Sequence, residues 1–302
     1  MNTLTRRNFL GRTLAIGAGL SSLALGKSGK LSAALRTAKD DISLAAWSLV
    51  RDFRQGKWKN LDLPRICRED FDINGIEFVN TFFEVPTNGY LNKLKKNADD
   101  YGVKMVLIMV DGEGEMASSS KKDRMQTVIN HRKWVDIAQY LGCHSIRTNC
   151  RGPKDASRED VLNWAEESFN YLLEYAVPAK MSVVIENHGG LSSDPDFLVS
   201  LMERVNNLYF GLLPDFGNFI KDVDLNEVLR KVVPYATGIS VKSYFTAQGT
   251  HPRYDLERCV KTCHDAGYRG FYGIEAEGRE SSSYEQVRLT KKVLDKVLFG
   301  KG

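Results

Sequence analysis

Eight short apolar segments alternate with longer segments of helical periodicity along most of the chain. Strict alternation of this kind predicts a parallel sheet whose strands are joined by right-handed crossovers. Eight such units in one chain of 302 residues predict that the sheet closes into a single (β/α)8 TIM barrel. The expected strands are residues 41–49, 75–80, 103–110, 144–150, 182–189, 209–217, 238–245 and 271–278.

An open, doubly wound sheet is the alternative fold. It would require a glycine-rich phosphate-binding turn directly after the first strand, and the sequence there reads WSLVRDF. No second domain and no repeat beyond the strand–helix unit is visible. The sequence therefore predicts one α/β barrel domain over residues 35–302.

The first 34 residues differ in character from the rest of the chain. Arg6 and Arg7 precede Phe9 and Leu10, and a short apolar stretch rich in glycine and alanine follows. This order is typical of a twin-arginine signal, so we expect residues 1–34 to be a signal peptide and the mature protein to be periplasmic. An uncleaved or lipid-anchored amino-terminal helix is the alternative. No other segment is long and apolar enough to span a bilayer, so no stable membrane insertion is expected after signal removal.

The signal region also carries most of the basic excess of the chain. The full sequence has a formal charge of +4, but residues 1–34 hold five basic residues and no acid, which leaves −1 for residues 35–302. A charge so close to zero gives no electrostatic case for a nucleic-acid partner.

The five cysteines form no recognisable framework. Their number is odd, and no pair has the spacing of a CxxC motif. Because twin-arginine substrates fold in a reducing compartment before export, we expect free, partly buried thiols. The residues are Cys67, Cys143, Cys150, Cys259 and Cys263.

Nearly every expected strand ends in polar residues. Active residues of such barrels project from the carboxyl ends of the strands, where all eight ends meet at one mouth. A polar cap at one strand end is ordinary, but such residues at all eight predict an active site. They are Trp47, Glu77, Asn80, Asp111, Arg147, Asn149, Glu186, His188, Asp215, Asn218, Ser240, Lys242, Glu275 and Glu277.

The alternation of side chains along a strand divides the segment VIENHGG, residues 184–190, into two faces. Residues two apart share a face, so Glu186 and His188 point the same way. We expect Asn187 to face the surrounding helices and to act as a structural clamp. His188 is either a functional residue or a hydrogen-bonded loop residue.

Three carboxylates, those of Glu186, Asp215 and Glu275, are expected to converge at the barrel mouth. Converging carboxylates repel one another unless they are protonated or bridged by a cation. Hard divalent ions such as Mn²⁺ or Mg²⁺ prefer oxygen ligands, and a metal that polarises a carbonyl lets one glutamate remove a neighbouring C–H proton and another return it. Alternatively, one of the three is a structural acid paired with Lys242 or Arg147.

Several strand-end motifs together resemble the sugar phosphate isomerase/epimerase family of xylose isomerase-like barrels, particularly its exported twin-arginine members. The motifs are VIENHGG, LPDFGNF, ISVKSYF, GYRGFYGIEAEG, DGEGE and WVDIAQYLGCHSIRTN. The resemblance implies a divalent metal held by Glu186, Asp215 and Glu275, and it implies that the two glutamates exchange the substrate proton.

The chain departs from that family at the seventh strand, where the resemblance implies a metal-binding histidine and the sequence has Ser240. Three explanations are open. The metal is held by three carboxylates and water, or His188 or His251 replaces the missing ligand, or no metal binds and Lys242 supplies the positive charge.

The predicted function is that of an exported sugar isomerase or epimerase that removes a proton next to a carbonyl. Glu186 and Glu275 would be the acid/base pair, and Lys242 and His188 would polarise the substrate. The expected partner is a small sugar, and a homo-oligomer is compatible with the sequence. The expected substrate-binding residues are Trp47, Glu77, Arg147, Asn149, Asn218 and Glu277.

Three other functions compete with this prediction. A 3-keto-glycoside lyase or hydratase would begin with the same proton abstraction. A catalytically silent sugar-binding protein would explain the missing histidine. An abasic-site endonuclease shares the barrel, but its multi-metal site needs many histidines, and this chain has five in total.

Aromatic residues near the strand ends are candidates for an apolar wall beside a sugar ring. They are equally common as filling between the layers of a barrel. The candidates are Trp47, Phe82, Phe83, Tyr244 and Phe245.

Overall fold

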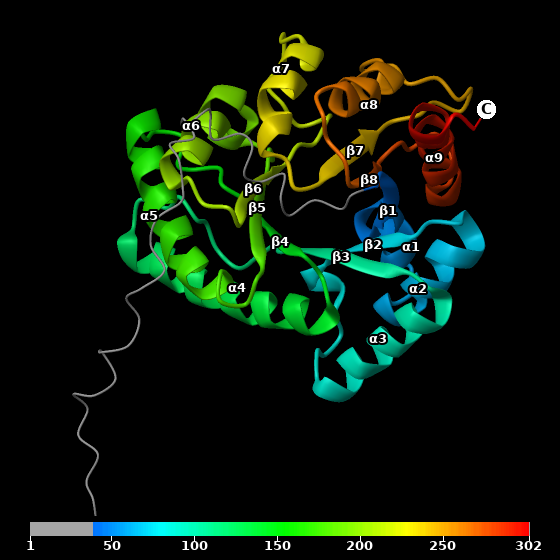
Figure 1. Ribbon diagram of the computed structural model, residues 1–302, viewed down its shortest axis with the longest axis horizontal. Coiled ribbons are helices and arrows are strands. Elements are labelled where there is room, and N and C mark those ends of the chain that lie inside the picture. Colours follow the sequence, from blue (N-terminus) through cyan, green and yellow to red (C-terminus); the bar gives the residue numbers. More distant parts are fainter. Residues whose placement is uncertain (1–38, 302) are drawn as a thin grey trace, which may run out of the picture.

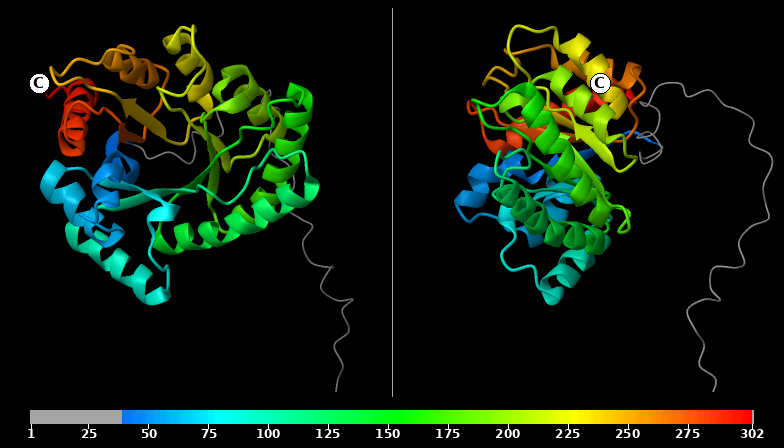
Figure 2. Two further views of the ribbon diagram at one scale, coloured as in Figure 1. Left: turned by 180° about the vertical axis from the view of Figure 1, so that it is seen from behind. Right: turned by 90° about the vertical axis from the view of Figure 1, so that its left-hand side faces the viewer.

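The computed structural model describes residues 39–301, so the expected signal peptide lies outside the described residues. Eight parallel strands are hydrogen-bonded in the order β6-β5-β4-β3-β2-β1-β8-β7. Figures 1 and 2 show the helices as a ring around these strands, which confirms the TIM barrel. The strands are β1 (Asp41–Ala45), β2 (Gly75–Val79), β3 (Lys104–Met109), β4 (Ser145–Thr148), β5 (Ser182–Glu186), β6 (Phe210–Leu213), β7 (Ile239–Ser243) and β8 (Phe271–Ala276).

The barrel closes between β6 and β7 through isolated bridges rather than a continuous ladder. One bridge joins Leu212 to Ala236, and the other joins Asp215 to Ser240. The Ser240 amide donates to the Pro214 carbonyl at 2.9 Å. Closure of the barrel therefore places Asp215 directly beside Ser240.

The strands are shorter at their carboxyl ends than the sequence predicts. The first was expected to reach residue 49, but β1 ends at Ala45 and a 3₁₀ turn, η4 (Ala46–Leu49), carries Trp47. The sixth was expected to reach residue 217, but β6 ends at Leu213. The apolar runs continue beyond the strands because the following turns are buried as well. Trp47 and Asp215 therefore lie on loops of the barrel mouth.

Residues 60–70 form three short segments rather than one continuous helix. These are η5 (Asn60–Asp62), α2 (Leu63–Arg65) and a π-helical turn, η6 (Ile66–Asp70). Pro64, which lacks an amide hydrogen, lies at the start of α2, where an amide would have no helical partner.

Capping residues fix the starts of the seven longer helices. A Ser, Thr or Asp precedes each of them, and its side chain accepts a hydrogen bond from a backbone amide of the first turn. Each of these seven helices therefore begins shortly after a loop at the barrel mouth. The helices are α1 (Val50–Arg54), α2, α3 (Asn88–Tyr101), α4 (Lys121–Leu141), α5 (Arg158–Ala176), α6 (Pro195–Val205), α7 (Leu225–Val232), α8 (Leu256–Asp265) and α9 (Ser283–Phe299).

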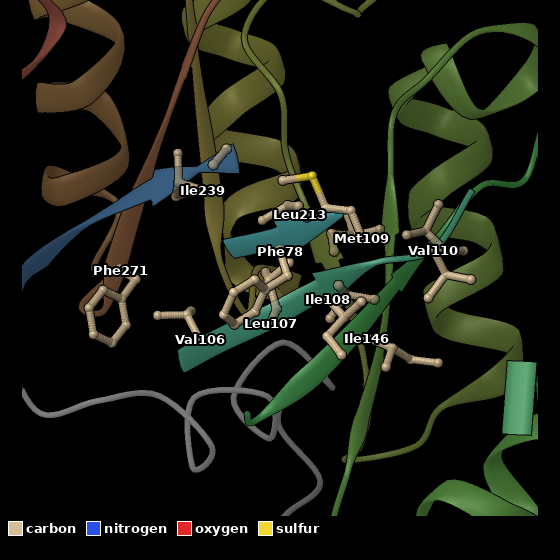
Figure 3. Packing of buried hydrophobic residues seen from close by; sticks show 14 of the residues in the cluster. Phe78, Val106, Leu107, Ile108, Met109, Val110, Ile146, Leu213, Ile239 and Phe271 are labelled. Carbon is tan, nitrogen blue, oxygen red and sulfur yellow. The ribbon is translucent and has the colours of Figure 1, made fainter. Parts of the chain in front are cut away.

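The strands are buried on both faces, as expected for a parallel sheet covered by helices. Every residue of β2, β5 and β8 is buried. Figure 3 shows apolar side chains such as Phe78, Ile108 and Ile146 packed together along the strands. Within residues 39–301, no helix has the length and apolarity that a membrane span requires.

All five cysteines are free, as expected, and all are buried, whereas partial burial was expected. Burial raises the pKa of the Cys143 thiol to about 12, so it stays protonated and unreactive at neutral pH.

Candidate active site

Three buried carboxylates converge at the carboxyl ends of the strands. Glu186 is the last residue of β5, Asp215 follows β6, and Glu275 lies in β8. One oxygen from each lies within 4.8 Å of the others. We call these three residues the acidic cluster. The convergence expected from the sequence is therefore present.

The ammonium group of Lys242, in β7, lies against the acidic cluster. Its Nζ is 3.1 Å from Asp215 Oδ2 and 3.1 Å from Glu275 Oε1, and only 3% of its side chain is exposed. Although burial opposes its charge, the carboxylates raise the pKa of Lys242 well above its usual value. Gly217 makes room for this side chain, since a Cβ there would lie 2.9 Å from Lys242 Cδ. The chain thus supplies its own cation to the cluster.

Arg147, in β4, is a second buried cation. Its Nε forms an ion pair with Glu186 Oε2 at 2.9 Å, and its Nη1 donates to Asp111 Oδ1 at 2.8 Å. Asn149 donates to the same oxygen of Asp111 at 2.9 Å. Although burial acts against its charge, Arg147 and Asn149 hold the pKa of Asp111 below its usual value. Arg147 therefore links the acidic cluster to the loop that follows β3.

The hydroxyl of Ser240 bridges two members of the cluster. Its Oγ is 3.0 Å from Asp215 Oδ2 and 3.0 Å from Glu275 Oε2. A hydroxyl has one hydrogen, so both contacts are satisfied when one carboxyl group is itself protonated. Burial raises the pKa of Asp215 well above its usual range, whereas Lys242 and Ser240 outweigh burial and lower the pKa of Glu275. Of the two acids, Asp215 is therefore the one that is protonated more easily.

Two asparagines hold these acids, Asn187 through the backbone and Asn218 through the side chains. The amide of Asn187 exchanges two hydrogen bonds with the backbone of Asp215, at 2.8 Å and 2.7 Å, which makes it the clamp expected from the sequence. Asn218 donates to Glu186 Oε1 at 3.1 Å and accepts from Lys242 Nζ at 3.3 Å. The expected substrate-binding residue Asn218 is thus engaged within the site.

His188 lies at the mouth outside the acidic cluster. Its Nδ1 is 2.7 Å from Nη2 of Arg151, and Arg151 Nε donates to the His188 carbonyl at 2.8 Å. Because a guanidinium group only donates, Nδ1 accepts, and the neutral ring carries its hydrogen on Nε2. The sequence interpretation missed Arg151, although it continues the two-residue spacing of Arg147 and Asn149.

Glu77 is placed inside the barrel rather than at its mouth. It is 1% exposed, and Ser43 donates to its Oε1 at 2.6 Å. A Cβ on Gly273 would lie 2.2 Å from the same oxygen, so only glycine leaves room for the carboxyl group. Burial raises the pKa of Glu77 to about 8, and Glu275 and Glu186 contribute to this shift. Glu77 is therefore protonated at neutral pH.

A cavity of about 520 Å³, the inner cavity, opens above the acidic cluster. Glu275 is the only member of the cluster that lines it. Glu186 lies behind Arg147, and Asp215 is fully buried. The charged and polar lining residues are Asp111, Glu115, Arg147, Asn149, Arg151, His188 and Glu275, with Trp47 at the edge.

A second cavity of about 920 Å³, the outer cavity, shares Trp47 with the inner one. The Trp47 indole N–H donates to Glu277 Oε1 at 2.8 Å, and its ring stacks on Phe82. Tyr244 and Phe245 line the outer cavity, but Phe83 packs against Trp134 of α4. The expected aromatic wall is therefore divided between the cavity and the core.

The acidic cluster could hold a divalent metal ion, since its donors are all oxygens. An ion bound to Asp215 and Glu275 would lie about 2.0–2.6 Å from their oxygens. Lys242 Nζ lies 3.1 Å from Asp215 Oδ2 and 3.1 Å from Glu275 Oε1. A metal ion on these two oxygens would therefore compete with the ammonium group of Lys242 for them.

No histidine contributes to the cluster within the described part of the chain. His251, the other suggested replacement ligand, is held by the Tyr254 carbonyl at 2.9 Å from Nδ1. Ser240 occupies the position where the family resemblance implies a histidine, and its hydroxyl is already used between two carboxyl groups.

Comparisons with known proteins agree with this architecture. A family model described as a xylose isomerase-like TIM barrel matches residues 69–296. A similar solved structure is the 3-keto-D-glucoside 4-epimerase YcjR from E. coli, which is 12% identical with a TM-score of 0.68 and covers 85% of this chain and 99% of its own. A comparison with curated proteins gives no match.

Two further similar structures contain metal ions. The IOLI protein with a bound zinc atom is 14% identical, with a TM-score of 0.70 and coverage of 85% of this chain and 98% of its own. A barrel protein from Mycobacterium smegmatis in complex with magnesium is 17% identical, with a TM-score of 0.63 and coverage of 85% and 97%. Identities this low show a shared fold only. Because the family model matches well over half of the chain, the protein belongs to the xylose isomerase-like TIM barrel family.

Proposed function

We propose that the protein is a sugar-modifying enzyme that removes a proton from the carbon next to the carbonyl of a sugar or keto-sugar derivative. The observation that carries this proposal is the environment of Glu275. Its carboxylate reaches the inner cavity, and Lys242 and Ser240 keep its pKa below the usual value. A general base must be ionised and accessible, and Glu275 meets both conditions within the acidic cluster.

The proposed step transfers one proton and leaves an enolate. The C–H bond breaks, its proton moves to a carboxylate oxygen of Glu275, and the electron pair of the bond passes into the enolate. The enolate oxygen would accept hydrogen bonds from Nε2 of His188 and from Arg147, which both line the inner cavity. Donors aimed at the developing negative charge stabilise the transition state more than the ground state.

Glu186 and Glu275 were expected to form the acid/base pair, and their positions favour different roles. Glu186 is 1% exposed and forms an ion pair with Arg147, which separates it from the inner cavity. We therefore assign proton removal to Glu275 and assign to Glu186 the positioning of Arg147. Return of the proton by Glu275 to the neighbouring carbon gives an isomerase, whereas an epimerase also needs a proton donor, such as a water molecule, at the opposite face of the carbon.

Lys242 would supply the positive charge that a metal ion would otherwise supply. Its ammonium group contacts Glu275 and Asp215 and so limits the repulsion within the cluster. A metal that displaced this ammonium group would polarise the carbonyl directly. The proposal is that proton transfer proceeds without an added divalent ion.

Elimination from a 3-keto glycoside is a second candidate. It starts with the same proton removal and ends with expulsion of the substituent on the neighbouring carbon. The outer cavity favours elimination. It meets the inner cavity at Trp47, and its volume of about 920 Å³ could hold the expelled substituent.

The test is incubation with keto sugars and 3-keto glycosides in deuterated water. Deuterium incorporation at one carbon is expected, and Glu275→Gln should abolish it. Glu285→Gln, which changes an exposed glutamate in the first turn of α9, is the matched control. Exchange that survives Glu275→Gln would refute the assignment. Sugar binding without any exchange would instead indicate the silent sugar-binding protein.

A further inference from the structure

The outer cavity has an unusual concentration of arginines. Its walls contain Arg51, Arg54, Arg253 and Arg279 but only two acidic residues, Glu277 and Glu280. These residues come from the segments that follow β1, β7 and β8. Those three strands are neighbours in the barrel, so the arginines converge from separate segments on one space.

These arginines lack carboxylate partners at ion-pair distance in the described part of the chain, although Arg51 interacts electrostatically with Asp52. Among residues 39–301, none of the four forms an ion pair with a carboxylate, although Arg147, Arg151 and Arg158 all do. Arg51 donates only to neutral groups, the Ser283 hydroxyl and the carbonyls of residues 278 and 281.

The two acids in the wall are already bonded to other groups. Glu277 accepts from the Trp47 indole, and Glu280 accepts from the backbone amide of Ala247 at 3.0 Å. Even with both counted, the lining has an excess of two positive charges. A concave surface with uncompensated charge of one sign attracts ligands of the opposite sign.

Two of the arginines are held against aromatic rings. The guanidinium carbon of Arg253 lies 3.3 Å from the centre of the Tyr244 ring, and that of Arg54 lies 5.7 Å from the centre of Trp47. A guanidinium group on a ring face keeps its N–H edge available for a carboxylate or a sulfate.

The inner cavity has the opposite balance of charge. Asp111, Glu115 and Glu275 face two arginines there, so an anionic group is disfavoured beside the proposed base. A saccharide that spans both cavities would place its neutral carbonyl unit in the inner one and its anionic unit beyond Trp47 in the outer one.

We propose that the outer cavity binds the anionic group of an acidic saccharide, a carboxylate or a sulfate ester on the sugar unit next to the one that reacts. The inference rests on the proposed function only in placing the reacting unit in the inner cavity. Both cavities have volumes typical of small-molecule sites.

Calorimetry with three matched disaccharides tests this proposal. The probes carry glucuronate, 6-sulfated glucose or plain glucose at the same end. At least one acidic probe should bind about tenfold more tightly than the neutral one at low salt, and added salt should reduce this difference. A larger gain in affinity for the glucuronate probe indicates a carboxylate site, and a larger gain for the 6-sulfated probe indicates a sulfate site.

The double variant Arg253→Gln/Arg279→Gln should remove the preference for acidic probes and leave binding of the neutral probe unchanged. Both residues are exposed on loops, and retained neutral binding shows that the variant is folded. Arg230→Gln on the exposed face of α7 is the control for a general loss of charge.

The proposal would be overturned if all three probes bound equally or if none of them bound. It would also be overturned if Arg230→Gln reduced the preference for acidic probes as much as the double variant does. Failure of the proposed function is a separate result. It would appear as arginine-dependent binding of an acidic saccharide without deuterium incorporation.

Discussion

Lys242 is the residue on which the electrostatics of the site depend. It lies 3.1 Å from two buried carboxyl groups, at the place where a bridging metal ion would bind. The serine at position 240 and the lysine at 242 share one face of β7, so the strand that lacks the expected histidine also provides the cation.

Lys242→Met is expected to destabilise the protein by about 3–5 kcal/mol, because it leaves buried carboxylates without their partner. The same change frees space for a metal ion. Mn²⁺ should therefore raise the Tm of the variant but not that of the wild-type protein. Lys93→Met, at an exposed position of α3, is the control. A chelator that lowers the Tm or the activity of the wild-type protein would show instead that a metal is bound alongside Lys242.

Glu77 predicts a pH dependence of stability. Its pKa is about 8 in the folded protein against a usual value of 4.5, so between these pH values the folded chain holds a proton that the unfolded chain has lost. Stability due to this group therefore falls as pH rises through that window.

Glu77→Gln should remove this contribution, since glutamine keeps the shape and does not titrate. Between pH 5.5 and 7.5 the wild-type free energy of unfolding should fall by up to about 2.7 kcal/mol more than that of the variant. Urea unfolding at the two pH values measures the difference. Parallel pH profiles of the two proteins would mean that Glu77 is ionised in the folded state.

At the scale of the elements, the β5–β6 junction positions Asp215. Asn187 follows β5 and bonds twice to the backbone of Asp215, and the bridge between Asp215 and Ser240 then completes the barrel. Asn80 holds the backbone of Asp111 in the same way, with two bonds of 2.9 Å between the ends of β2 and β3. Asparagine clamps thus connect neighbouring strands beyond the point where their ladders end.

Asn187→Ala is expected to cost about 1–3 kcal/mol of stability, because it leaves buried backbone groups without partners. It should also lower kcat, since the contacts of Asp215 with Ser240 and Lys242 would be misplaced. Chemical unfolding and the deuterium-exchange assay measure the two effects. Asn163→Ala, on the exposed face of α5, serves as the control. An unchanged exchange rate in Asn187→Ala would show that the site does not depend on this clamp.

At the scale of the whole molecule, export of the chain remains a prediction. The twin-arginine motif lies outside the described residues. Replacing Arg6 and Arg7 by lysine should retain the protein inside the cell at its full length. Fractionation with amino-terminal sequencing measures this, and Arg12→Lys is the control. Export of the double variant would contradict the signal assignment.

The sequence by itself determined the barrel and the ring of strand-end residues. Eight alternating strand and helix segments without a glycine-rich turn after the first strand predict a closed barrel, and the two-residue period of a strand assigns Ser240 and Lys242, or Arg147 and Asn149, to common faces. These local properties are enough to place Glu186, Asp215 and Glu275 together, and the structure has all three in one cluster.

Only the tertiary structure decided which of these residues form ion pairs and how deeply each one is buried. Strand period could not show that Lys242 reaches between Asp215 and Glu275, that Arg147 separates Glu186 from the inner cavity, or that Glu77 is enclosed beside Gly273. The sequence predicts that all strand-end residues lie at the barrel mouth. How far each side chain lies below the surface of that mouth depends on packing between several strands, which the sequence pattern does not show. Strand pairing also brings the arginines of three loops into one cavity, because the segments after β1, β7 and β8 become neighbours only when β8 pairs with both β1 and β7.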